Sequence, residues 1–279
     1  MKKVILAVAL LLSSVLSFGQ INSDKKPTIQ LVRNATLLIE YSGKKMLLDP
    51  MLSSKGAIDS WAGIQKNPTV ELKIPIEEIV KGVDLVIVTH THEDHFDQPA
   101  SKILDKSIEL IMQPADKDFF NKEGFVNATV LENQKVWNGI TITRIEGQHG
   151  TGEVLAKMGK TSGFVLQAKK QPTVYIVGDA IWTEDVKKII KKFKPDYIVV
   201  NSGGAVIKGY ENTPILMNEE QTMTLIKESG KAKVITVHMD ALDHCFTTRA
   251  SLKKKAAELK ISSDKLLIPD DGDIIQLSL

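Results

Sequence analysis

The chain has 279 residues, of which 43% are hydrophobic and 25% are charged; this length and composition suffice for one large or two small globular domains and exclude a disordered or fibrous chain. Its 36 Lys and Arg residues stand against 34 Asp and Glu. Because Lys2 and Lys3 lie in a segment that we expect to be removed, the charge of the remaining chain balances, which argues against a nucleic-acid partner.

The first residues have the pattern of a secretory signal peptide. Two lysines precede an unbroken apolar run from Val4 to Leu12, and the small residues Ser17 and Gly19 follow, as they do before a cleavage site. The apolar stretch is shorter than the roughly 20 residues that a membrane anchor needs. We therefore expect an exported, most simply periplasmic protein without an integral membrane segment in the mature chain. The predicted divisions are a signal peptide at 1–19, a leader at 20–27 and one domain at 28–279.

The mature chain opens with three short apolar runs of β type, at Thr28–Val32, Ala35–Tyr41 and Lys45–Leu48. Turn-forming residues join these runs, so they predict an antiparallel meander. A long irregular stretch at 49–74 follows and contains Trp61 among other apolar residues. A loop of this length favours a flap over a pocket, and packing of Trp61 onto the core explains the residue equally well.

Short helices and strands then alternate, and the chain runs twice from strands to helices. Helices are predicted at 75–80, 99–104, 183–193, 218–228 and 248–259, and strands at 85–88, 109–112, 128–131, 141–145, 163–168, 173–177, 198–201 and 234–238. The acidic segment 270–273 is expected to form the turn of a hairpin. Two similar halves predict an α/β (α+β) fold, a four-layer αββα sandwich of two mixed β-sheets with helices on the outer faces.

Four of the buried runs end in polar residues. His90 follows the run at 86–88, Asp179 follows 175–177, and Asn201 and His238 end the runs that contain them. In sheets that helices cover, sites gather at the carboxyl ends of strands. Function is therefore expected at these ends.

The densest chemical signal is the segment His90-Thr91-His92-Glu93-Asp94-His95, which places three of the six histidines within six residues. Alternate imidazoles on an extended turn, followed by an Asp-His pair, can converge on one or two metal ions, because His and carboxylate are the usual ligands of zinc, iron or manganese. A solvated surface cluster has no reason to follow a buried strand directly. The segment therefore indicates a metal site.

This pattern, His-x-His-x-Asp-His after an apolar strand, resembles the signature of the metallo-β-lactamase superfamily of metallohydrolases. Four further residues match the other elements of that family in order: Asp49, His149, Asp179 and His238. The likeness spans about residues 28–277. Within the superfamily, the segment at 34–50 looks like the opening of the ascorbate-6-phosphate-lactonase-like branch.

The resemblance implies a binuclear centre. A first metal would be held by His90, His92 and His149, and a second by Asp94, His95 and His238, with Asp179 bridging the two. Zn²⁺ is the expected ion, and Mn²⁺ or Fe suits the same ligands.

Each distal residue also has a plainer explanation when it is taken singly. His149 could be a loop surface residue, Asp179 a helix cap and His238 a core histidine; together, and in the order of the family, the ligand interpretation is favoured. Asp49 is expected to orient a ligand or the loop that carries it, and a plain turn carboxylate before Pro50 explains it nearly as well.

Three residues are candidates for contact with the substrate: His244, Trp61 and Asn201. His244 lies six residues beyond His238 and is expected at the mouth of the pocket, although an exposed loop position explains it equally well. Cys245 is expected to be a buried, inert thiol, because the sequence places no basic neighbour other than His244 beside it.

The sequence thus predicts an exported, binuclear metal-dependent hydrolase in which a metal-bridging hydroxide attacks an ester-like bond, and Asp94 orients the nucleophile or moves its proton. The substrate is expected to be a small molecule, a lactone or other carboxylic ester first and a phosphodiester second. Two other classes stay open, a mononuclear iron redox enzyme on the same fold and a non-catalytic exported metal-binding protein. The sequence leaves the oligomeric state undetermined.

Overall fold

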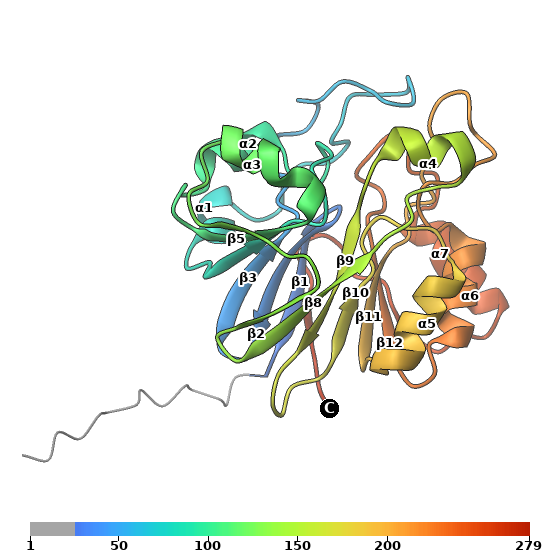
Figure 1. The fold of residues 1–279 in the computed structure, drawn as a ribbon. Helices are drawn as coiled ribbons and strands as arrows, with labels where there is room; N and C mark the ends of the chain where they lie inside the picture. The colour runs from blue at the N-terminus through green and yellow to red at the C-terminus, as the bar shows by residue number, and fades with distance from the viewer. Residues whose placement is uncertain (1–25) are drawn as a thin grey trace, which may run out of the picture.

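The computed structural model describes residues 26–279, so the predicted signal peptide and nearly all of the leader lie outside the described residues. Two seven-stranded sheets lie face to face, and helices cover the outer face of each (Figure 1). The predicted αββα sandwich of two mixed sheets is confirmed. None of the helices within residues 26–279 combines the length and the apolar character needed to cross a membrane.

The first sheet has the strand order β14-β1-β2-β3-β4-β5-β6. Its strands are β1 (Thr28–Arg33), β2 (Thr36–Tyr41), β3 (Lys44–Leu48), β4 (Leu85–Ile87), β5 (Glu109–Met112), β6 (Ala128–Val130) and β14 (Ile274–Gln276). β1 to β3 form the predicted antiparallel meander, and β3 to β6 are parallel. The helices on this sheet are α1 (Ile76–Val80), α2 (Gln98–Ile103) and α3 (Lys117–Lys122).

The second sheet has the order β13-β12-β11-β10-β9-β8-β7. Its strands are β7 (Gln134–Trp137), β8 (Ile140–Glu146), β9 (Ser162–Gln167), β10 (Val174–Ile176), β11 (Tyr197–Asn201), β12 (Lys233–Val237) and β13 (Leu266–Leu267). β7 to β10 are antiparallel and β10 to β13 are parallel. Helices α5 (Glu184–Phe193), α6 (Glu219–Glu228) and α7 (Arg249–Glu258) cover its outer face, and α4 (Gly152–Met158) follows β8.

The main core lies between the two sheets. Because side chains alternate along a strand, Leu37 and Ile39 from the first sheet meet Phe164 and Val199 from the second in one buried cluster. The opposite faces of the strands pack under the helices in two further clusters. The central strands of each sheet are therefore packed on both faces, which holds the loops at their ends in place.

The predicted hairpin at 270–273 is wrong, because the strands on its two sides belong to different sheets. β13 pairs with β12, whereas β14 pairs with β1. Arg249 holds the crossover, since its guanidinium donates to Pro269 O (2.8 Å) and to Asp271 Oδ1 (2.5 Å). The local sequence shows the turn residues, but the partner that decides the path of the segment lies on α7.

The strands that precede the predicted site residues point the same way. β3 and β4 are parallel in the first sheet, and β10, β11 and β12 are parallel in the second. β8 has the same direction as β10, because both are antiparallel to β9. Their carboxyl ends therefore lie at common sheet edges, where the following loops can meet.

Candidate metal centre

Four loops bring the seven predicted ligands together. The loop after β4 carries four of them, and the loops after β8, β10 and β12 carry one each. Their ligand atoms form two groups, within each of which the atoms lie within 4.8 Å of one another: His90, His92 and His149 in the first, and Asp94, His95, Asp179 and His238 in the second. The structure thus places every predicted ligand in one cluster.

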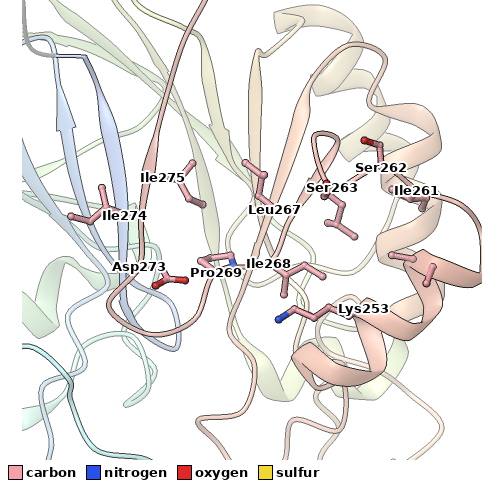
Figure 2. Close-up of a pocket in the computed structure, with 13 residues that line it drawn as sticks. Lys253, Ile261, Ser262, Ser263, Leu267, Ile268, Pro269, Asp273, Ile274 and Ile275 are labelled. Atoms are coloured by element: carbon pink, nitrogen blue, oxygen red, sulfur yellow. The ribbon is translucent and has the colours of Figure 1, made fainter.

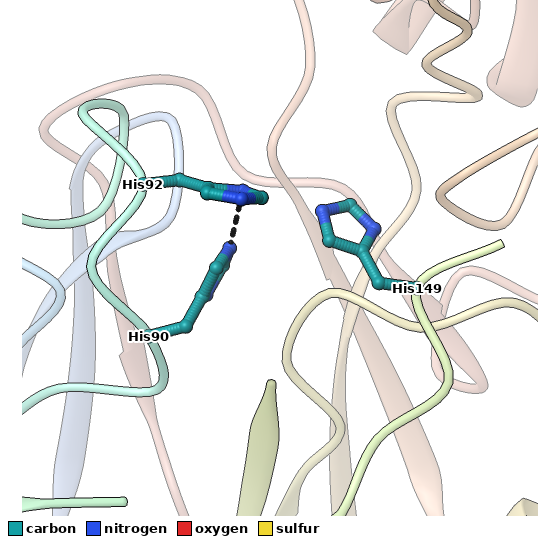
Figure 3. Close-up of side chains that lie close together, drawn as sticks. All are labelled: His90, His92 and His149. Atoms are coloured by element: carbon teal, nitrogen blue, oxygen red, sulfur yellow. Dashed lines mark hydrogen bonds between the residues drawn. The ribbon is translucent and has the colours of Figure 1, made fainter. Parts of the chain in front are cut away.

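The first group joins the two sheets. His90 Nε2 lies 2.8 Å from His92 Nδ1, and the ring of His149 points toward both from the opposite loop (Figure 3). His90 and His149 are buried, whereas His92 is half-buried. The group is therefore enclosed on the protein side and accessible at His92.

Asp179 borders both groups. Its Oδ2 lies 3.1 Å from His95 Nε2, 3.4 Å from His149 Nε2 and 3.8 Å from His90 Nε2. Its Oδ1 lies 3.7 Å from His238 Nε2, which is itself 3.1 Å from Asp94 Oδ2. This carboxylate therefore lies between the two groups of candidate ligands.

Gly178 makes the approach of Asp179 possible. Its φ is +72°, and a Cβ at this position would lie 2.5 Å from Ser162 O. Only glycine adopts this conformation readily and leaves room for the neighbouring backbone. The Gly-Asp pair after β10 is therefore a structural requirement of the site.

Asp49 lies behind the candidate ligand His95. Its carboxylate accepts hydrogen bonds from Thr89 N and Thr89 Oγ1, both at 2.7 Å, and contacts His95 Nδ1 at 2.8 Å. A carboxylate on one imidazole nitrogen keeps the proton there and leaves the other nitrogen free to bind a metal. Asp49 therefore aims His95 Nε2 at the centre.

Other ligands are held from behind in the same way. His149 Nδ1 donates to Ile215 O at 2.8 Å, and Asn201 Nδ2 donates to Asp179 Oδ1 at 2.6 Å. The predicted contact of Asn201 with substrate stays a prediction, but its amide has a second role in fixing the central carboxylate. His238 Nδ1 faces the thiol of Cys245 at 3.6 Å.

The cluster has strongly shifted pKa values. Burial alone would raise the pKa of Asp94 and Asp179, but the neighbouring charge of His95 and His238 holds both well below the usual range. Burial alone would lower the pKa of His95, but Asp179, Asp94 and Asp49 raise it well above the usual value. Burial lowers the pKa of His90 and of His149.

These features fit divalent metal ions. Asp49, Asp94 and Asp179 are buried around His95, and their negative charge keeps this imidazole protonated. A metal cation at the same place would balance that negative charge and displace the proton. The donor set is imidazole and carboxylate without thiolate, which suits zinc, manganese or iron. The hydrogen bonds behind His95 and His149 leave Nε2 of each ring facing the cluster.

The loop at 49–74 brings Trp61 to His244. Ile58 and Asn67 pair through two backbone hydrogen bonds of 2.7 and 2.8 Å, and Trp61 between them meets the ring of His244 edge to face, with centroids 4.9 Å apart. Trp61 also packs on the small cluster that contains Met51 and Leu242. The indole therefore both packs on the protein and lies beside His244.

His244 is 7% exposed, so the explanation of an exposed loop residue is wrong. Burial lowers the pKa of its ring to about 4, against the opposing charge of Asp94, and the ring is neutral at pH 7. Its contact with substrate stays a prediction.

Sequence reasoning missed two residues that shape the centre. The first is Asn34, in the turn after β1. It donates to Asp94 O at 3.1 Å and accepts from His238 N at 2.9 Å, so it ties together loops from both sheets. Asn34 sits in a tight turn with φ +57°, and a turn asparagine has no sequence signal that separates this role from turn formation. The second residue is Asp243, which holds the Trp61 loop.

A cavity of about 560 Å³ lies away from the centre, between α7 and the crossover from β13 to β14 (Figure 2). Leu267, Ile268 and Ile275 line it together with Lys253 and Asp273. None of the seven candidate ligands takes part in it, so this cavity is separate from the candidate metal centre.

The fold, the cluster and the comparisons with known proteins define a metal-dependent hydrolase. A sequence profile described as a beta-lactamase superfamily domain matches residues 44–239. The chain belongs to this superfamily, and the predicted resemblance is confirmed.

Three similar proteins cover nearly the whole chain. The UPF0173 protein YddR of Bacillus subtilis (strain 168) is 36% identical over 251 residues, which are 88% of this chain and 98% of that protein. The structure of a possible metal-dependent hydrolase from Veillonella parvula DSM 2008 has a TM-score of 0.87 and 33% identity, covering 91% of this chain and 100% of that one. The isothiocyanate hydrolase from Delia radicum gut bacteria has a TM-score of 0.85 and 37% identity, covering 90% and 100%.

Proposed function

We propose that the chain is a binuclear hydrolase. The observation that carries the proposal is the position of Asp179, whose Oδ2 lies within 3.4 Å of a nitrogen from each ligand group. His90, His92 and His149 would hold one ion, and Asp94, His95 and His238 the other, with Asp179 shared. Two divalent ions held there supply Lewis acidity and lower the pKa of water to about 7.

The residues of the chain position and move the reacting groups. Asp94 is ionised, because His95 and His238 keep its pKa low, and its carboxylate can accept a proton and pass it to the leaving group. Half-buried His92 marks the side from which a small molecule enters. The proposed substrate is a lactone or other carboxylic ester, with a phosphodiester as the second choice.

A second candidate reaction is the hydrolysis of an isothiocyanate. It is favoured by the solved isothiocyanate hydrolase, which is 37% identical to this chain and fully covered by it. The central carbon of an isothiocyanate is an electrophile, as an ester carbonyl carbon is, so attack by water requires the same positioning of nucleophile and proton acceptor. Ester hydrolysis and isothiocyanate hydrolysis therefore require different substrate pockets but the same metal-binding residues.

The metal content of the purified protein tests the proposal. About two zinc or manganese ions per chain, measured by plasma mass spectrometry, are expected for the wild type, and fewer for His90→Ala. Glu93→Gln is the matched control, because Glu93 lies in the same motif but is exposed. One iron per chain with thiol-dependent oxygen uptake would instead indicate the mononuclear redox enzyme.

A substrate panel then separates the candidates. Lactones, carboxylic esters, phosphodiesters and alkyl or aryl isothiocyanates are offered to the metal-loaded protein. Turnover that Asp94→Ala abolishes supports the hydrolase, and the substrate class with the highest kcat/KM assigns the reaction. Two bound ions with no turnover of any class would favour a non-catalytic metal-binding protein.

The narrower placement in the ascorbate-6-phosphate-lactonase-like branch stays a prediction, which the same panel tests when it includes a phosphorylated sugar lactone.

We also propose export, on the signal-peptide pattern at 1–19. The intact mass of the protein recovered from the periplasm of the producing cell tests this proposal. A chain that begins at Gln20 is expected, and an uncleaved chain in the cytoplasm would contradict it.

A further inference from the structure

The carboxylate of Asp243 is enclosed by the Trp61 loop. It accepts hydrogen bonds from the backbone N–H groups of Trp61 (3.1 Å), Ala62 (3.1 Å) and Ile64 (3.3 Å). The side chain of Ser60 also donates to it, and so does Asn67 Nδ2 at 3.0 Å. One buried anion thus organises the whole tip of the loop, since hydrogen bonds to an ionised acceptor are stronger than neutral ones.

Hydrogen bonds between the Trp61 loop and the segment that contains Asp243 run in both directions. Asp243 N donates to Asn67 Oδ1 at 2.8 Å, and Thr69 N donates to Ala241 O at 2.8 Å. Asp243 is followed directly by His244, and His238 begins the same segment. The loop that carries Trp61 is therefore fastened to the segment that supplies a metal ligand.

His244 has a polar atom that the protein leaves without a partner. Its Nδ1 is buried and makes no hydrogen bond within residues 26–279. Buried polar side-chain atoms are nearly always paired. The next residue along the chain, Cys245, lies with its Sγ 3.6 Å from Nδ1 of the candidate ligand His238, and the His244 ring contacts Trp61. The unpaired nitrogen therefore belongs to a side chain held between the Trp61 loop and the segment that carries His238.

We propose that Asp243 is a positioning residue that fixes Trp61 against His244, and that the two rings form a wall of the substrate pocket. The wall suits a small electrophile with an aromatic or other flat apolar substituent, because the indole offers an apolar face. His244 Nδ1 would hydrogen-bond a heteroatom of that molecule. This inference rests on the proposed hydrolase and names its substrate class.

Hydrogen exchange tests the role of Asp243 without any substrate. In Asp243→Asn, exchange of the amides of Trp61, Ala62 and Ile64 should be at least about tenfold faster, because the charged acceptor is lost. Asp59→Asn is the matched control, since Asp59 lies in the same loop and its exposed side chain pairs with exposed Lys66 (3.0 Å) and not with the amides around Asp243. Unchanged exchange in Asp243→Asn would refute the positioning role.

Two metal-chelating probes test the wall itself. Acetohydroxamate and phenylacetohydroxamate share a head group, and burial of the phenyl ring should make the second bind about tenfold more tightly to the metal-loaded wild type. Asp243→Asn and Trp61→Ala should lose this preference, with acetohydroxamate affinity and metal content unchanged. Equal affinity of the two probes for the wild type would refute the wall, as would an equal loss of both in the variants.

His244→Phe separates the polar role from the shape of the ring. It keeps a flat ring beside Trp61 but removes both nitrogens, so it should retain the phenyl preference and bind both probes about three- to tenfold more weakly. Undiminished affinity would refute the polar role of His244. A wild type that holds no metal and binds neither probe would refute the proposed function, and the exchange rates would still decide the role of Asp243.

Discussion

Replacing Asp49 with Asn should weaken metal binding by about 10- to 100-fold and leave the fold intact. Such a loss corresponds to about 1.4 to 2.7 kcal/mol. Asp49 is 1% exposed and has its Oδ2 2.8 Å from His95 Nδ1. The introduced amide can still accept from Thr89 N through its oxygen, but its NH₂ group then faces His95 Nδ1. That contact drives the imidazole proton to Nε2, the atom aimed at Asp179, and blocks it as a ligand.

Competition with a chromogenic zinc chelator measures this loss directly. Circular dichroism and urea unfolding show whether the variant keeps the fold. Asp264→Asn is the control, because Asp264 is exposed and far along the chain from the candidate ligands. A folded Asp49→Asn variant that binds both ions with wild-type affinity would show that the proton position on His95 does not depend on Asp49.

Three further changes address the rest of the structure. Gly178→Ala should lower the free energy of unfolding by about 2 kcal/mol or more, because the position has φ +72° and a Cβ there would lie 2.5 Å from Ser162 O; an unchanged urea midpoint would contradict this. Tyr41→Phe should cost about 1 to 2 kcal/mol in the same assay, because it removes the hydrogen bond from Tyr41 Oη to Pro172 O (2.9 Å) and leaves that carbonyl unpaired. Burial raises the pKa of Asp116 from 3.8 to about 6, so the folded protein binds the proton of this carboxyl more tightly than the unfolded chain does. As the pH rises from about 4 to about 6, loss of this proton therefore lowers the free energy of unfolding. Asp116→Asn should therefore lose less stability than the wild type over that interval, and parallel urea titration curves from pH 4 to 7 would refute the assignment.

The ligand set could be predicted because its signals are local. The segment from His90 to His95 follows a buried strand, and its residue types are those that bind zinc-like ions. His149, Asp179 and His238 are ambiguous one at a time, and only their order along the chain favours them as ligands. The structure brings all of them together, since the strands that precede them share a direction within each of the two sheets and so end at common edges.

Residues that act through distant partners could not be predicted in this way. Asp243 is an ordinary loop aspartate in the sequence, and its function depends on amides some 180 positions away. The crossover between β13 and β14 depends on Arg249, which local turn chemistry does not reveal. In both cases a charged side chain fixes an irregular segment, and hydrophobic periodicity carries no information about such contacts.

The pairing of β1 with β14 also decides what can be attached to this molecule. Thr28 lies opposite Gln276, so the two ends of the described chain emerge side by side (Figure 1). β1 runs from this point toward Asn34, which contacts the loops of the metal centre, and the ends therefore leave from the side remote from it. A fusion partner, an affinity tag or a surface linker that replaces the residues before Lys26 or follows Leu279 would therefore leave from the side remote from the candidate metal centre.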